Sequence, residues 1–319
     1  MIQEELKTIL ESLEEEFFSS KRLEYIKAFE RISSRYRKGS GFFLQTEEER
    51  RVYLFTRLPG TLSAVSKVFE EIFLRYGDAY SSFLDVGAGP GTGMWAALHY
   101  FKKIKNCLLL EKDVQFTALG REIAKKASSI PIKEALFHIC DLEKPIKVEP
   151  HDLVLLSYSI GEIQEDKWSS LLETLWSATM KTLVIIEPGT PAGYLRLMKI
   201  REILIKLGGF LWAPCPHSLS CPLEKGDWCH FSSRVQRTSL HRQLKSADLG
   251  YEDEKFSYLV FGKSPLNSFE SRVIRRPIKH SGHVEFTLCQ EKGIQKIVYS
   301  KKDKELYRSR KKLEWGDFF

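Results

Sequence analysis

The sequence predicts an α/β fold with a doubly wound, mostly parallel sheet, an α-helical N-terminal extension and a cysteine-rich, metal-binding insertion. From Ser81 onward, short apolar runs alternate with longer helical stretches, as in βαβ units whose strands are buried on both faces. A glycine-rich turn at 87–91 follows the first apolar run. Further along the chain, 213–231 contains three cysteines among prolines, a composition that excludes a long helix or a central strand.

Length and composition allow a full core without disulfides. The chain has 319 residues, of which 43% are hydrophobic. It contains no run of about eighteen apolar residues, so we expect no membrane-spanning helix. The first residues are acidic and have a helical pattern, unlike a secretory signal or a transit peptide. We therefore expect a cytoplasmic location, in which the six cysteines stay reduced.

Changes in pattern along the chain suggest four regions. They are a helical N-terminal extension at 1–78, a cofactor-binding Rossmann-like core at 79–212, a cysteine-rich metal-binding insertion at 213–245, and the last core strands with a basic hairpin and tail at 246–319. Expected strands are Phe83–Val86, Cys107–Leu110, Leu136–Ile139, Leu153–Ser157, Leu183–Ile186, Ser257–Gly262, His283–Cys289 and Ile294–Tyr299. Expected helices are Glu4–Phe18, Lys21–Tyr36, Glu47–Arg57, Leu62–Tyr76 with Thr61 as its cap, Gly91–Tyr100, Val114–Lys126, Lys167–Ala178 and Tyr194–Lys206.

The glycine turn carries the clearest chemical signal. Glycines let the chain turn tightly and bring backbone N–H groups close to a ligand, and the following helix N-terminus adds further donors. The Asp-x-Gly-x-Gly-x-Gly form resembles the first motif of class I methyltransferases more than the turn of NAD enzymes, and it suits a ligand without a pyrophosphate. We therefore predict a class I methyltransferase-type fold that binds S-adenosylmethionine through Asp85, Gly87, Gly89 and Gly91.

Polar residues at the ends of the other expected strands extend this cofactor site. Glu111 ends the second strand, where a carboxylate can accept hydrogen bonds from ribose hydroxyls, and Asp141 follows the third, where it can meet the adenine amino group. Leu142 and Ser157 complete the candidate set. The alternative is that the acids are ordinary helix caps. The segment 157–162 lacks the Asn-Pro-Pro-Tyr signature of many amino-group methyltransferases, so no catalytic residue is predicted.

Four cysteines form a candidate metal site. Cys215, Cys221 and Cys229 are close in sequence, and Cys289 ends a predicted strand beside a hairpin turn. Four thiolates suffice for a [4Fe–4S] cluster or a tetrahedral zinc ion. The spacing of the cysteines in the sequence does not decide between a cluster, a zinc ion and no metal at all. His217 and His230, near these cysteines, keep a mixed-ligand zinc site open. The other two cysteines, Cys107 and Cys140, have apolar surroundings typical of core residues.

The basic excess is concentrated at the C-terminal end. From Lys263 onward there are 14 Lys or Arg against 7 Asp or Glu, an excess equal to the net charge of +7 of the whole chain. Such a region favours a polyanionic partner, with RNA as the first candidate, although a solvated basic tail is the simpler alternative. The predicted phosphate-binding residues are Arg275, Arg276, Lys279, Lys301, Lys302, Arg310, Lys311 and Lys312, with Arg234, Arg237 and Arg242 as a possible extension.

Several segments together resemble a known family. They are EPGTPAG (Glu187–Gly193), APCPH (Ala213–His217), CPL (Cys221–Leu223), DWCHF (Asp227–Phe231), YEDEKFSYLVF (Tyr251–Phe261) and RRPIKHSGHV (Arg275–Val284), with YLFTRLPGT (Tyr53–Thr61) and the closing Trp315-Gly316-Asp317. This set is similar to the methyltransferase-like small-ribosomal-subunit assembly proteins, which have mitochondrial and bacterial members.

The resemblance implies a class I methyltransferase fold, a [4Fe–4S] cluster on Cys215, Cys221, Cys229 and Cys289, and association with maturing small-subunit rRNA. We therefore expect an rRNA-binding assembly factor for the small ribosomal subunit that acts as a monomer. The alternative is an active S-adenosylmethionine-dependent rRNA methyltransferase, because a fold alone does not establish a reaction.

Overall fold

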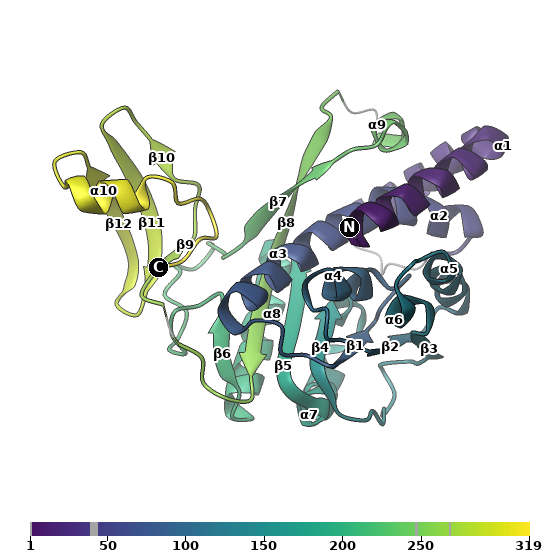
Figure 1. Cartoon of the computed structure of the whole chain (residues 1–319), viewed down its shortest axis with the longest axis horizontal. Coiled ribbons are helices and arrows are strands. Elements are labelled where there is room, and N and C mark those ends of the chain that lie inside the picture. The colour runs from purple at the N-terminus through teal and green to yellow at the C-terminus, as the bar shows by residue number, and fades with distance from the viewer. Residues whose placement is uncertain (1, 39–43, 246–247, 268) are drawn as a thin grey trace. The chain divides into compact units, whose positions relative to one another are not determined.

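The computed structural model describes residues 2–38, 44–245, 248–267 and 269–319 (Figure 1). The chain divides into two compact units, which are described separately. The first, called the glycine-turn unit, consists of Met1–Met180 and Ser233–Glu254. The second, called the cysteine unit, consists of Lys181–Ser232 and Lys255–Phe319.

The glycine-turn unit contains a parallel sheet of four strands in the order β3-β2-β1-β4. Its strands are β1 (Ser82–Val86), β2 (Asn106–Glu111), β3 (Leu136–Ile139) and β4 (His151–Ser157). All four lie where apolar runs predicted them, and β4 is buried along nearly its whole length. The helices that follow these strands are α4 (Thr92–Tyr100), α5 (Val114–Lys125), α6 (Ile130–Lys133) and α7 (Trp168–Ala178), with short 3-10 turns at Ile160–Glu162 and Glu165–Lys167. The mixed α/β fold with a parallel central sheet is therefore confirmed.

Three further helices precede this sheet. They are α1 (Ile2–Lys38), α2 (Glu47–Thr56) and α3 (Leu58–Tyr76), which pack on one another, and both α1 and α3 also contact α4. The first is one continuous helix where two were expected, because no Gly or Pro interrupts its sequence. The third begins at Leu58, with Pro59 in its first turn, so Thr61 lies inside the helix and is not its cap. Within the described residues, no helix combines the length and the apolar character needed to cross a bilayer.

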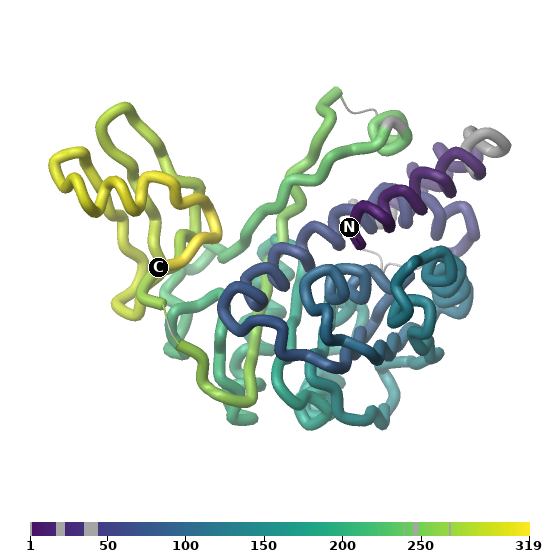
Figure 2. The backbone as a smooth tube through the Cα atoms, viewed as in Figure 1, coloured from purple at the N-terminus to yellow at the C-terminus, as the bar shows by residue number. Residues whose placement is uncertain are grey.

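An excursion of the chain at 233–254 also belongs to the glycine-turn unit. Figure 2 traces it along β7 (Phe231–Gln236), through α9 (Ser239–Lys245) and back along β8 (Tyr251–Gly262), which pairs with β7. Glu14 of α1 accepts a hydrogen bond from the Leu240 backbone N–H at 3.2 Å. Burial of this carboxyl group raises the pKa of Glu14. The excursion is thus attached to the N-terminal helix.

The cysteine unit contains two sheets. In the first, β5 (Thr179–Pro188) and β6 (Phe210–Ala213) pair antiparallel with opposite edges of β8, and α8 (Pro191–Lys206) connects them along the chain. In the second, the order is β10-β11-β12, and β9 also pairs with β11. Its elements are β9 (Arg272–Val273), β10 (Ile278–Lys279), β11 (His283–Gln290), β12 (Gly293–Ser300) and the packed helix α10 (Lys304–Arg310). Val273, Val284, Phe286 and Leu288 form its buried core.

Candidate functional site

The glycine turn has the conformation that the motif predicts. Gly87, Gly89 and Gly91 have φ angles of +67°, +55° and +87°, a region that residues with a side chain rarely adopt. A Cβ atom on Gly87 would lie 2.5 Å from the Cβ of Ser159. Gly91 is the N-cap of α4, so the backbone N–H groups at the start of this helix lie at the turn. The turn therefore leaves room for a ligand only because its residues are glycines.

Asp85 lies beneath this turn and not on its open side. Its side chain is 1% exposed, and a Cβ on Gly93 of α4 would lie 2.5 Å from its Oδ2. Burial and the nearby charge of Glu111 together raise the pKa of Asp85 to about 7, against the opposing effect of the Met94 and Gly93 backbone amides. The Asp85 carboxyl group thus lies against the first turn of α4, the helix that begins at the glycine turn.

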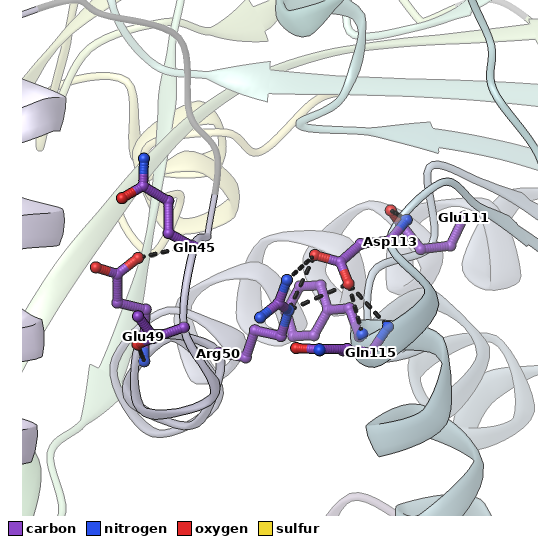
Figure 3. A network of polar contacts seen from close by, with 8 residues as sticks. Gln45, Glu49, Arg50, Glu111, Asp113 and Gln115 are labelled. Carbon is purple, nitrogen blue, oxygen red and sulfur yellow. Dashed lines mark hydrogen bonds and ion pairs between the residues drawn. The ribbon is translucent and has the colours of Figure 1, made fainter.

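The Glu111 carboxylate organises the loop around the turn (Figure 3). One of its oxygens accepts the Gly89 backbone N–H at 2.8 Å, and the other accepts the Asp113 backbone N–H at 2.9 Å. Each carboxylate oxygen has a second lone pair, so acceptance of a ribose hydroxyl is compatible with these contacts. Glu111 therefore positions the glycine turn in addition to its predicted role as a ligand.

Arg50 and Asp113 were missed from the sequence. Asp113 caps α5 by accepting the backbone N–H groups of Gln115 and Phe116, both at 2.9 Å. Arg50 of α2 donates to the same carboxylate through Nε and Nη2, at 2.9 and 2.7 Å from Oδ2, as Figure 3 shows. This bidentate pair joins α2 to the loop between β2 and α5. A capping Asp was readable from the sequence, but its arginine partner, 63 positions away, was not.

The remaining cofactor candidates lie around the same edge of the sheet. The Cδ1 atom of Leu142 lies 3.8 Å from the position of a Cβ on Gly87. Asp141 is half-buried and forms an ion pair with Lys144 at 3.4 Å. Ser157 ends β4, and the next residue, Tyr158, has a φ of +55°, which is unusual for a residue with a bulky side chain. The Tyr158 hydroxyl donates to Glu254 Oε1 at 3.3 Å.

All four candidate ligand cysteines line one apolar cavity of the cysteine unit. Cys215, Cys221 and Cys229 come from the irregular segment 214–230, and Cys289 comes from β11. Burial raises the pKa of Cys229, and the neighbouring sulfurs of the other three cysteines raise it further. Burial also raises the pKa of Cys289 to about 12. The other two cysteines, at 107 and 140, lie in the glycine-turn unit and outside this cavity.

Three polar side chains, also missed from the sequence, hold this cavity together. The Tyr194 hydroxyl donates to Cys221 Sγ at 3.2 Å. Arg201 of α8 is 5% exposed and donates through Nη2 to the Leu219 carbonyl at 2.7 Å. Arg272 of β9 is 1% exposed and faces Cys289 in the β9–β11 register. Positive charge from both arginines opposes the pKa rise of Cys289, so the cavity favours thiolates more than an apolar cavity alone would.

The expected spacing of the sulfurs differs between a zinc ion and an iron–sulfur cluster. A tetrahedral zinc ion with Zn–S bonds of about 2.3 Å places its sulfurs about 3.8 Å apart. In the described part of the chain, no three of these sulfurs approach within 4.8 Å of one another. An iron–sulfur cube spaces its thiolates more widely because each binds a different iron atom. His230, a candidate for mixed ligation, instead stacks on Trp228 with ring centroids 5.4 Å apart.

The predicted phosphate-binding residues of the cysteine unit fall into two groups. Some have partners within the unit: Arg275 pairs with Asp227 at 2.5 Å, Lys279 pairs with Glu314, and Arg310 stacks on the Phe319 ring at 3.6 Å. Arg276, Lys279, Lys301, Lys302, Lys311 and Lys312 are exposed, and Lys311 also lies over the Tyr307 ring at 5.8 Å. In the glycine-turn unit, Arg234 pairs with Asp253 and Arg237 with Glu252, both at 3.0 Å.

Comparison with known families identifies one match. The family model described as mitochondrial small ribosomal subunit Rsm22 matches residues 47–319. The match includes the glycine turn and all four cavity cysteines.

Curated relatives agree with this match. The human mitochondrial ribosome assembly protein METTL17 is 29% identical over 293 residues, which cover 85% of this chain and 62% of that protein. The mitochondrial Rsm22-cox11 tandem protein 2 of Schizosaccharomyces pombe is 23% identical, covering 86% of this chain and 43% of that protein. This chain thus spans less than two thirds of either relative. The cytoplasmic location predicted from the sequence is wrong: these relatives are named mitochondrial, and an acidic first helix does not determine the compartment.

Solved structures with related folds are methyltransferases. Magnesium protoporphyrin IX methyltransferase of Synechocystis, solved with bound S-adenosylmethionine, has a TM-score of 0.44 at 13% identity and covers 80% of this chain and 97% of its own. A TehB-like S-adenosylmethionine-dependent methyltransferase of Corynebacterium glutamicum has a TM-score of 0.40 at 16% identity, with 74% and 98% covered.

Proposed function

Because the chain belongs to the Rsm22 family of small-ribosomal-subunit proteins, we propose that it is an assembly factor that binds immature small-subunit rRNA. In this proposal it acts as a monomer, holds S-adenosylmethionine at the glycine turn and carries a [4Fe–4S] cluster on the four cavity cysteines. The observation that carries the proposal is the family match over 47–319, which includes both sites. Relatives named as ribosome assembly proteins support it.

The glycine turn supports S-adenosylmethionine binding. Gly87 and Gly89 open the space beside the carboxyl end of β1, and α4 presents backbone N–H groups to the ligand. Glu111 and Asp141 provide acceptors for the ribose hydroxyls and the adenine amino group, while Leu142 adds an apolar contact. Bound there, the cofactor supplies an electrophilic methyl group. The residues of the chain bind and orient it.

We predict that Gly87→Ala lowers the affinity for S-adenosylmethionine by more than about tenfold, which corresponds to at least about 1.4 kcal/mol. The added methyl group would lie 2.5 Å from the Cβ of Ser159, so the glycine turn would have to shift. Gly77→Ala is the control, because Gly77 also has a positive φ, of +76°, which is unfavourable for a residue with a side chain. No atom lies within 4 Å of a Cβ at Gly77.

Calorimetric titration of both variants measures this difference, with thermal unfolding as the check on folding. Unchanged affinity in Gly77→Ala and reduced affinity in Gly87→Ala support the assignment. Equal affinities in the two variants would place the cofactor elsewhere.

The cysteine cavity supports a [4Fe–4S] cluster over zinc. Four thiols from two separate segments reach one apolar cavity, and among the described residues no three of these sulfurs lie within 4.8 Å of one another, whereas a tetrahedral zinc site places them about 3.8 Å apart. The guanidinium groups of Arg201 and Arg272 supply positive charge for the thiolates. Complete cysteine ligation would leave no open iron position for a substrate. The role we propose for the cluster is therefore structural, without electron transfer.

The exposed basic residues of the cysteine unit are the proposed rRNA contacts. Lys301, Lys302 and Lys312 are exposed, whereas Arg234 and Arg237 form ion pairs with Asp253 and Glu252. Arg275, Lys279 and Arg310 would have to exchange an internal partner for a phosphate. We therefore assign most of the phosphate binding to the first set.

Incubation of the cluster-loaded protein with immature small subunits and methyl-labelled S-adenosylmethionine tests the proposed function. We expect stable binding without label in the rRNA, and a weaker salt dependence when Lys301, Lys302 and Lys312 are replaced by alanine. Each lost phosphate contact reduces the log–log slope by about 0.7–0.9. Absence of binding contradicts the assembly role. Label in the rRNA selects a second candidate, an rRNA methyltransferase, which the open glycine turn favours.

A further inference from the structure

Two histidines and a glutamate converge at the tip of the C-terminal sheet, outside both sites described above. The His280 backbone N–H donates to the His283 carbonyl at 2.9 Å, closing a two-residue turn between β10 and β11. Ile278 faces Glu285 and Lys279 faces Val284 in this register, so the next facing pair is His280 and His283. Because strand side chains alternate with a period of two, His283 and Glu285 point to the same face. The backbone thus places all three side chains together.

The ligand atoms of these three side chains are close to one another. His280 Nε2 lies 3.2 Å and His283 Nε2 lies 3.5 Å from the same carboxylate oxygen, Glu285 Oε1. The two imidazole rings stack, with centroids 4.2 Å apart and an angle of 16° between their planes. One ligand atom from each residue lies within 4.8 Å of the others. Two nitrogens and one oxygen therefore surround a common point.

This geometry matches a metal-ion site better than an ion pair. A tetrahedral zinc ion with bonds of about 2.0–2.1 Å to nitrogen and oxygen places neighbouring ligand atoms about 3.4 Å apart. The two measured nitrogen–oxygen distances, 3.2 and 3.5 Å, bracket that value. An ion pair or a hydrogen bond to Glu285 accounts for each imidazole separately. A divalent cation satisfies both histidines and the carboxylate together.

We propose that His280, His283 and Glu285 bind one divalent transition-metal cation of the zinc class. Each side chain keeps between 40% and 44% of its surface exposed, so the metal is accessible and its fourth position is filled by water or an external anion. The neighbouring Lys279 is ion-paired with Glu314, which reduces its repulsion of the cation. The metal would fix the β10–β11 turn. This site is separate from the cysteine cavity and does not depend on the proposed function.

Cobalt(II) titration of the full-length, cluster-loaded protein tests this site. Cobalt bound by nitrogen and oxygen has weak visible bands, whereas cobalt bound by thiolate adds intense near-ultraviolet charge-transfer bands. We expect one equivalent of the first kind, displaced by zinc. His283→Gln and His280→Gln should each lower the cobalt affinity by more than about 100-fold. Loss of a residue that only supports a ligand lowers metal affinity by about 10–100-fold, so loss of a direct ligand should lower it further.

His138→Gln is the matched control, because His138 is also an exposed strand histidine, on β3 of the glycine-turn unit. We expect it to bind cobalt as the natural protein does. Circular dichroism of each variant checks folding. A natural protein without the weak visible bands, or unchanged cobalt affinity in folded His280→Gln and His283→Gln, overturns the proposal. Thiolate bands alone would locate the metal at the cysteines and also overturn it.

Discussion

Replacing Cys289 with serine is expected to lower the iron content of anaerobically purified protein from about four atoms per chain to under about one. Cys289 is 8% exposed and comes from β11, whereas the other three thiols come from the irregular segment 214–230. A neutral serine hydroxyl is a poor iron ligand, and the apolar cavity offers it no base. Because binding and local folding are coupled, segment 214–230 should also become sensitive to proteolysis.

Cys140→Ser provides the control for this experiment. Cys140 is a half-buried thiol of the glycine-turn unit, so its replacement should change neither iron nor sulfide content. Iron, sulfide and zinc analysis with visible absorption gives the readout. Stoichiometric zinc without sulfide in the natural protein would replace the cluster by a zinc site. Full iron and sulfide content in Cys289→Ser would remove this residue from the ligand set.

The sequence was most informative about strands that form short apolar runs. Helices follow β1, β2 and β4 along the chain, and β1 and β4 are largely buried, so this pattern is local. The conformation of Gly87, Gly89 and Gly91 was equally readable, since a positive φ selects glycine locally. These features required no knowledge of distant contacts.

Contacts between distant positions were not predictable. The Arg50–Asp113 pair and the hydrogen bond from Leu240 to Glu14 join residues far apart in sequence, and their charges resemble those of any solvated helix face. The strands β6, β7, β9 and β10 were missed because they are short or mostly polar, and their pairing partners come from elsewhere in the chain. Cysteine spacing suggested a ligand set, but it could not give the distances between sulfurs.

Glu111 shows which contacts of a strand-end acid are not readable from the sequence. Its place at the end of β2 predicted a cofactor ligand, with a helix cap as the alternative. Its carboxylate in fact accepts backbone N–H groups from Gly89 and Asp113, and Asp113 is the residue that caps α5. The sequence identified an acid at the carboxyl end of β2. Its dual contact depends on the folded turn.

Replacing Arg272 with methionine is expected to destabilise the cysteine unit by about 1–3 kcal/mol, the typical cost of leaving a buried hydrogen-bonding group without its partner. Arg272 is 1% exposed. Its Nε donates to the Pro214 carbonyl at 2.8 Å, and its Nη1 donates to the Gly316 carbonyl at 2.6 Å. These bonds connect the start of the cysteine segment, strand β9 and the C-terminal end of the chain. Methionine has a similar length but leaves both buried carbonyls without this donor.

Two further variants separate hydrogen bonding from charge. Arg272→Lys keeps the positive charge but loses the planar group that stacks near the rings of Phe269 and Phe318, 4.6 and 5.0 Å away. Arg276→Met removes an exposed arginine and should change stability by less than about 0.5 kcal/mol. Urea unfolding of the cluster-loaded protein measures these differences.

The reduction potential of the cluster is a second measurement. It would not change if Arg272 had a structural role only. Arg272 opposes the pKa rise of both Cys215 and Cys289, so its positive charge acts on the sulfurs that would hold the cluster. Reduction adds negative charge to a cluster, and loss of a nearby cation makes that step harder. We therefore expect a lower potential in Arg272→Met than in Arg272→Lys. Two results together would contradict the hydrogen-bonding role and the charge role of Arg272. They are an Arg272→Met variant as stable as Arg276→Met and a reduction potential equal to that of the natural protein, because loss of a buried cation that contacts the cysteine segment should lower stability and shift the potential.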